Sequence, residues 1–189
     1  MSRTLVVVML AAAGLFTAAP SHAQESARPN SIALRVGETV GFGLWRNVGP
    51  ALAVGLELAA SVDRLEGDDL EQEISDFTVE PAVKLYGPSG QPARSYLWGS
   101  VFYSVASETS TDTSGDETEI EVTQMGGSLG FGLEWFPIDR VSVGGHVGVR
   151  AGVRTTAFIF DDGLGDDELK ADGPFFRTLA SGIRVHFYF

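Results

Sequence analysis

Residues 175–189, FFRTLASGIRVHFYF, alternate between apolar and polar side chains, and this pattern decides the fold class. Successive side chains of a β-strand point to opposite faces. Small or polar residues such as Arg184 and His186 therefore share one face of this stretch. The other face carries the apolar residues Leu179, Ile183, Val185, Phe187 and Phe189. The period of two predicts a strand with one apolar face.

A terminal aromatic residue, preceded by apolar residues at every second position, resembles the closing strand of bacterial outer-membrane β-barrels. The resemblance implies a C-terminal signal that the outer-membrane assembly machinery reads, formed by Ile183, Val185, Phe187 and Phe189. The alternative is the last strand of a soluble β-sandwich. The remainder of the chain favours the barrel.

The N-terminus predicts export. Arg3 precedes an apolar segment from Leu5 to Phe16, and Ser21-His22-Ala23 offers a small-x-small cleavage site. We therefore expect a signal peptide at 1–23, a periplasmic lead-in at 24–30 and a barrel at 31–189. No apolar run approaches the roughly 18–20 residues that a membrane-spanning helix needs.

Composition excludes several classes of protein. The absence of cysteine excludes a disulfide framework, thiolate metal ligands and an acylated N-terminal cysteine. The net charge of −12 becomes −13 when the signal peptide, with its single charged residue Arg3, is removed. Such an acidic chain is not expected to bind nucleic acid, because phosphates would repel it.

Alternating stretches recur along the mature chain, at 31–45, 51–65, 77–87, 95–107, 120–136, 140–158 and 175–189. Short turns are expected at 46–50, 88–94 and 137–139. Long acidic loops are expected at 66–76, 108–119 and 161–174. Alternation of short turns with long loops is typical of an outer-membrane barrel.

The two faces of these stretches also support a membrane barrel. One face is almost wholly Val, Leu, Ile and Phe, and the other mixes Gly, Ser and Thr with charges, whereas a soluble barrel is apolar inside. For 95–107, where both faces carry aromatics, we expect Leu97, Val101, Tyr103 and Val105 to face outward. An interfacial aromatic girdle is expected to include Trp45, Tyr86, Tyr96 and Trp98.

Seven stretches conflict with the even strand number of bacterial single-chain barrels. We expect 29–45 to hold two short strands bent near Gly37-Glu38-Thr39, which gives eight. Length and pattern are then similar to the small barrels of the OmpA transmembrane-domain and OmpX type. This resemblance implies an antiparallel up-and-down barrel and a monomer in the outer membrane of a Gram-negative bacterium.

The interior of an eight-stranded barrel is just wide enough for side chains to fill it. Buried charges persist when they are paired, so the inward charges predict an ion-pair network that plugs the lumen. Its expected members are Arg35, Glu57, Asp63, Glu80, Lys84, Glu134, His146, Arg150, Arg154 and Arg184.

Two other functions remain open. Ser142 and His146 share a strand face, as a lipid-A-modifying barrel enzyme would require of a nucleophile and its base, although a group facing the lumen is poorly placed for lipid. A narrow pore is the other alternative. The favoured interpretation is a non-catalytic barrel with a structural or surface-interaction role, no catalytic residue and no cofactor.

Each of the three predicted loops holds six acids when the second is counted from Glu108 to Glu121, so they carry 18 of the 25 acids. A solvated outer surface explains such acidity. Clustered carboxylates also suit hard cations, so divalent cations that bridge to lipopolysaccharide are a second interpretation. We expect outer-membrane lipid, lipopolysaccharide and the assembly machinery as partners.

Overall fold

The computed structural model describes residues 29–36, 40–66, 70–87, 92–112, 117–161, 166–180 and 183–189. The predicted signal peptide, most of the lead-in and the bend at 37–39, including Glu38, lie outside these residues. Within the described residues, no helix is long and apolar enough to cross a membrane.

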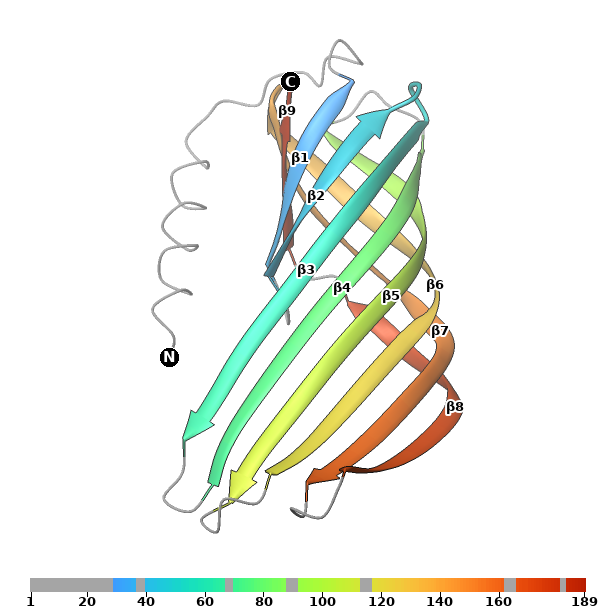
Figure 1. Ribbon diagram of the computed structural model, residues 1–189. Helices are drawn as coiled ribbons and strands as arrows, with labels where there is room; N and C mark the ends of the chain where they lie inside the picture. Colours follow the sequence, from blue (N-terminus) through green and yellow to red (C-terminus); the bar gives the residue numbers. More distant parts are fainter. Residues whose placement is uncertain are drawn as a thin grey trace.

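In the described part of the chain, nine antiparallel strands form one sheet (Figure 1). They are β1 (Asn30–Val36), β2 (Val40–Asn47), β3 (Leu52–Glu66), β4 (Leu70–Tyr86), β5 (Ala93–Asp112), β6 (Glu117–Ile138), β7 (Val141–Asp161), β8 (Asp166–Ala180) and β9 (Ile183–Tyr188). Each strand from β1 to β7 pairs with the next, and β9 pairs with both β7 and β1, so eight strands close a ring. The predicted all-β antiparallel barrel of eight strands is confirmed.

The first predicted strand is two strands, as the even strand number requires. β1 pairs with β2, with Ile32 opposite Leu44, and it pairs on its other side with β9, with Leu34 opposite Val185. The last predicted strand is also divided: β8 pairs with the outer part of β7 and β9 with its first residues.

The outer face of the ring is apolar. Leu129 and Val147, on neighbouring strands, are 69% and 64% exposed. In the ambiguous stretch 95–107, the predicted facing is confirmed, because Leu97, Val101 and Tyr103 are exposed while Trp98 is buried. The inner face is buried and mixes charged and polar side chains with alanines and large aromatic rings.

The predicted long loops are wrong for most of their residues. The β3–β4 ladder continues without a break to Glu66 opposite Glu71, and the β5–β6 ladder continues to Thr111 opposite Glu117. Likewise β8 begins at Asp166. Ladder hydrogen bonds satisfy the backbone regardless of side-chain charge, so the hairpins extend through residues whose acidity suggested loops.

Three of the strands are short, and this leaves the wall incomplete. β1, β2 and β9 end well before the far ends of β3 to β7 (Figure 1). Beyond Ala60, β3 pairs with β4 alone among the described residues, and β8 pairs with β7 alone. The outer part of β3 and the strand β8 therefore each have one edge with no strand pairing among the described residues.

Large aromatic side chains fill the lumen at the end where the chain terminates. Trp45, Tyr96 and Trp98 are each at most 5% exposed, so their predicted place in an interfacial girdle is wrong. Inward glycines make room for them: a Cβ at Gly55 would lie 2.3 Å from the Trp45 ring, and one at Gly132 would lie 2.3 Å from the Tyr96 ring. Large aromatic rings therefore share the interior of the ring of strands with the charged side chains.

Candidate functional site

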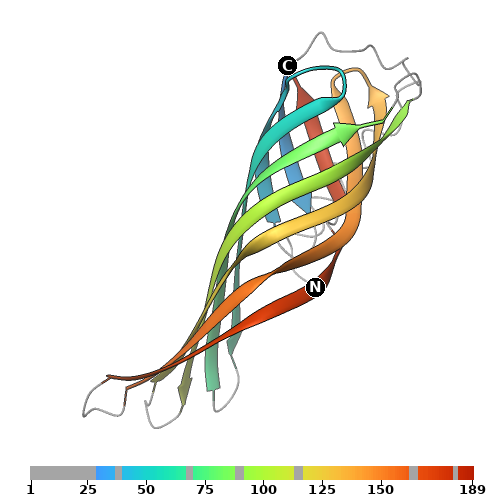
Figure 2. The same cartoon turned by 90° about the vertical axis from the view of Figure 1, so that its right-hand side faces the viewer.

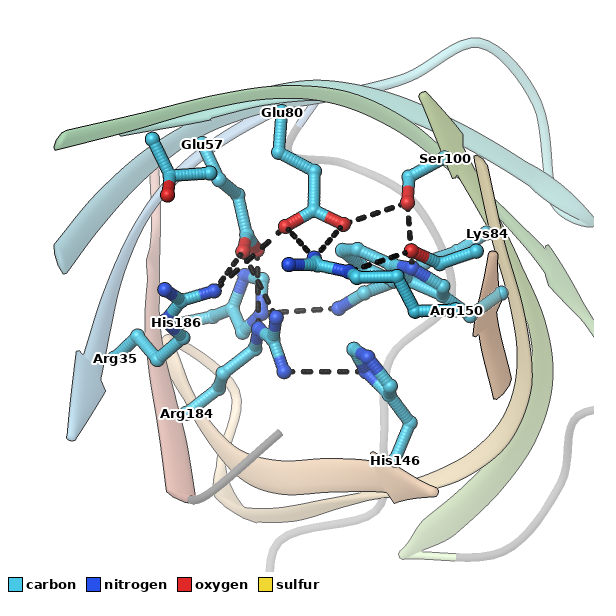
Figure 3. Close-up of polar contacts among 12 residues, drawn as sticks. Arg35, Glu57, Glu80, Lys84, Ser100, His146, Arg150, Arg184 and His186 are labelled. Carbon is cyan, nitrogen blue, oxygen red and sulfur yellow. Dashed lines mark hydrogen bonds and ion pairs between the residues drawn. The ribbon is translucent and has the colours of Figure 1, made fainter. Parts of the chain in front are cut away.

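Charged and imidazole side chains from several strands converge inside the ring (Figure 3). We call this set the lumen cluster: Arg35 on β1, Glu57 on β3, Glu80 and Lys84 on β4, Glu134 on β6, His146 and Arg150 on β7, and Arg184 and His186 on β9. Each lies at an inward position of its strand's alternation. The cluster therefore exists because period-two strands close into a narrow ring.

Glu80 and Arg150 form the first pair across the lumen. The Nη2 atom of Arg150 lies 2.9 Å from both carboxylate oxygens of Glu80. Ser100 donates to the same carboxylate at 2.6 Å, and Arg150 Nε donates to Ser128 at 3.1 Å. The Arg150 guanidinium also lies 4.1 Å from the centre of the Phe102 ring.

Glu57 and Arg184 form the second pair, with bidentate geometry. Arg184 donates from Nε at 3.0 Å and from Nη2 at 2.8 Å to the two oxygens of Glu57. Paired parallel hydrogen bonds of this kind are among the strongest that side chains make. Arg35 bridges the two pairs, with Nη1 lying 3.7 Å from Glu57 and 3.8 Å from Glu80.

Glu134 is the centre of the third group and is fully buried. It pairs with Lys84 Nζ at 3.3 Å and accepts hydrogen bonds from Tyr86 at 2.8 Å and Tyr188 at 2.5 Å. Ser142 also donates to this carboxylate. With both histidines neutral, the cluster holds four cations (Arg35, Lys84, Arg150, Arg184) against three carboxylates.

The two lumen histidines are held by neighbours. Arg184 Nη1 lies 3.1 Å from Nδ1 of His146, whose ring stacks on Trp98 with 4.2 Å between centroids. Lys84 Nζ lies 2.9 Å from Nε2 of His186. Ser142 is fully buried, and its hydroxyl donates a hydrogen bond to Glu134.

The structure brings together eight of the ten predicted network residues. Asp63 faces inward but lies on β3 beyond the end of β2, where it is exposed and makes no ion pair with a described residue. Arg154 is also exposed, and it lies 5.8 Å from the Phe175 ring rather than against a carboxylate. The structure therefore does not place these two residues in the cluster of buried charges, because the ring does not enclose their level.

The predicted network did not include the neutral partners of the charges. His186 is one, and the others are Ser100, Ser128, Ser142, Tyr86, Tyr188 and Trp98. All of them lie at inward positions. A search of the inward face for hydroxyl groups and rings, rather than for charges alone, would have found them.

Buried polar atoms in the cluster are satisfied. Among buried side-chain nitrogen and oxygen atoms of the described residues, only Trp45 Nε1 and Arg94 Nε lack a hydrogen-bond partner. No three His, Cys, Asp or Glu side chains of the described residues are placed to hold a metal ion. The hairpin centres, where the divalent-cation prediction falls in part, lie outside those residues.

The predicted C-terminal signal residues share the outer face. Ile183, Phe187 and Phe189 are exposed, and Val185 is partly exposed between them. Arg184 and His186, which alternate with them, are 1% exposed in the lumen. The short strand β9 thus contributes residues both to the apolar outer face and to the lumen cluster.

The fold is similar to that in the crystal structure of a major outer membrane protein from Thermus thermophilus. The two chains are 16% identical, the TM-score is 0.61, and the match covers 85% of this chain and 97% of that chain. No protein-family model and no curated protein matches the sequence. The comparison supports the fold of an outer-membrane β-barrel; membership of the OmpA or OmpX type stays a prediction.

Proposed function

We propose that this chain is a monomeric outer-membrane barrel of a Gram-negative bacterium, with a structural or surface-interaction role and a lumen closed to ions. The observation that carries the proposal is the lumen cluster, in which Arg150–Glu80 and Arg184–Glu57 cross the interior. A water-filled channel would separate such groups instead of pairing them.

The exposed apolar face supports the location. A soluble protein rarely exposes contiguous apolar patches of more than a few hundred Å². Here outward Leu, Val, Ile and Phe residues recur on every strand of the ring, as on Phe42 of β2 and Phe131 of β6. Contact with lipid acyl chains accounts for this surface.

Export and assembly complete the proposal. The signal peptide at 1–23 delivers the chain to the periplasm, and the outward face that ends at Phe189 is read by the assembly machinery. Lipopolysaccharide surrounds the outer part of the barrel. The pairing of the lumen charges disfavours the pore, and the burial of Ser142 disfavours the lipid-A-modifying enzyme.

Conductance tests the closed lumen. The purified, refolded protein is added to a planar lipid bilayer, and its insertion is confirmed by heat-modifiable mobility on a gel. We expect no stepwise conductance from the inserted protein. Regular conductance steps would establish the pore instead, and a change in lipid-A mass that depends on His146 would establish the enzyme.

A further inference from the structure

The mature chain is expected to hold two histidines, and both lie in the lumen cluster. The third histidine of the sequence, His22, belongs to the predicted signal peptide, and the chain has no cysteine. His146 and His186 are 5% and 1% exposed. His186 lies on β9, between β1 and β7 in the closed part of the barrel (Figure 2). Histidine is the side chain that ordinarily changes its charge between about pH 5 and 8, so the groups of this kind are enclosed by the barrel.

The contact of His146 with Arg184 requires a neutral imidazole ring. Arg184 Nη1 lies 3.1 Å from Nδ1 of His146 (Figure 3). A guanidinium group has donors and no acceptor, so Nδ1 accepts and carries no proton. From β5, the rings of Tyr96 and Trp98 pack against the imidazole. The charges that act on it are all positive: Arg184, Lys84, Arg35 and Arg150. A proton on His146 would therefore break the contact with Arg184 and add a further positive charge among these four.

The second histidine, His186, has charged neighbours of both signs. Lys84 Nζ lies 2.9 Å from its Nε2, and Ser31 Oγ lies 3.3 Å from its Nδ1. An ammonium group also has donors only, so Nε2 accepts from it. The rings of Trp45 and Tyr188 pack against the imidazole. The charges that act on it are those of Lys84, Glu134, Glu57 and Arg184. A proton here would be repelled by the cations and attracted by the acids, so the main role falls to His146.

The partner of His146 also belongs to an ion pair of the lumen cluster. Arg184 donates to both carboxylate oxygens of Glu57, at 3.0 and 2.8 Å. A guanidinium group displaced from His146 would disturb that bidentate geometry. Arg35 connects the same carboxylate to Glu80, with Nη1 lying 3.7 Å from the first and 3.8 Å from the second. The pairs are therefore joined through Arg184 and Arg35, so one proton on His146 can loosen more than one of them.

We propose that the lumen cluster is an acid-sensitive lock. A proton taken up from the medium by the ring of His146 breaks its contact with Arg184. A second proton, taken up by His186, breaks the contact with Lys84, and the loosened ion pairs open the interior to water. This inference rests on the proposed closed lumen and adds the condition under which the lumen opens.

The pH dependence of unfolding tests the coupling to protons. A histidine that is neutral in the folded barrel and takes up a proton in the unfolded chain makes unfolding more favourable as the pH falls. A histidine in water is half protonated near about pH 6.5. Each such ring should therefore raise the unfolding equilibrium constant about tenfold between about pH 7.5 and 5.5. Urea unfolding of the full mature protein in lipid vesicles should show a change of about a hundredfold for its two rings.

Two substitutions remove the proton sites and keep an acceptor. His146→Asn puts an amide oxygen near the place of Nδ1, and His186→Gln puts one near the place of Nε2. H146N/H186Q should unfold with the same equilibrium constant at both pH values, and each single variant should keep about a tenfold change. Asp63→His is the matched control, because a histidine at this exposed position should leave the pH dependence of the parent unchanged. Heat-modifiable mobility selects folded protein, and the single variants serve if the double variant does not fold.

Quenching of tryptophan fluorescence tests the opening. Trp135→Phe leaves Trp45 and Trp98, both buried in the lumen, as the remaining tryptophans. Acrylamide should quench them more strongly at the lower pH, and this difference should vanish when H146N/H186Q is added. Equal quenching at the two pH values, or a pH dependence of unfolding that H146N/H186Q retains, would overturn the lock. Conductance steps at neutral pH would refute the proposed closed lumen, whereas a silent bilayer with equal quenching would refute the lock alone.

Discussion

Replacement of Glu80 by alanine should destabilise the barrel more than any loss of an exposed acid. Glu80 is 2% exposed and accepts two contacts from Arg150 at 2.9 Å and one from Ser100 at 2.6 Å. Its removal leaves Arg150, itself 6% exposed, without its carboxylate. Breaking a buried pair in this way typically costs about 3–5 kcal/mol.

The neighbours of Glu80 determine which charge its removal leaves unpaired, and so how much unfolding free energy is lost. Arg35 retains Glu57 at 3.7 Å, so the uncompensated charge falls mainly on Arg150. Glu80→Gln keeps the volume and one acceptor oxygen, and it should cost less, about 1–3 kcal/mol. Asp63→Ala removes the same charge from an exposed inward position and should stay within about 0.5 kcal/mol of the parent.

Urea unfolding in lipid vesicles measures these differences, with the free energy extrapolated linearly to zero denaturant. The expected order of stability is parent and Asp63→Ala together, then Glu80→Gln, then Glu80→Ala. If Glu80→Ala were as stable as Asp63→Ala, water would be screening Arg150, and the closed lumen would be refuted.

Three further changes test other parts of the barrel. Leu129→Arg should cost about 2–4 kcal/mol of unfolding free energy in vesicles if the outward residue lies near the bilayer midplane, and indifference to the charge would mean that this face does not meet lipid. Deletion of Phe189 should lower the yield in the outer-membrane fraction, and an unchanged yield would remove its role in assembly. Gly132→Ala should cost about 1–3 kcal/mol of unfolding free energy, because its Cβ would overlap the Tyr96 ring. Gly99→Ala is the control: its Cβ would make only ordinary van der Waals contacts, so this variant should unfold with the free energy of the parent.

The faces of the strands could be predicted from the sequence because alternation is local. A residue such as Leu129 needs only its own strand to be assigned outward. Pairing across the lumen could not be predicted in the same way. Glu80 and Arg150 are 70 residues apart, and their contact depends on the register of every ladder between β4 and β7.

Two predictions were wrong for the same physical reason. Each was made from the type of a residue, without the residues that pair with it or pack against it in the fold. The acids of 108–112 suggested a loop, but a paired partner strand keeps them in the ladder. Trp45 and Tyr96 suggested a membrane girdle, but the glycines opposite them, Gly55 and Gly132, leave space in the lumen that these rings occupy. For Asp63 the opposite holds. Its inward face was predicted correctly, but it lies on β3 beyond the part of the barrel that the eight strands close.

The most direct test of the central claim is to measure whether lipid or water contacts the outer face of the barrel. The chain has no cysteine, so Leu129→Cys and Asp172→Cys each give a single site for a fluorescent label. The account predicts that a nitroxide on the lipid acyl chains quenches the label at 129 and that aqueous iodide quenches the label at 172. Quenching of the label at 129 by iodide, with no effect of the lipid nitroxide, would contradict it.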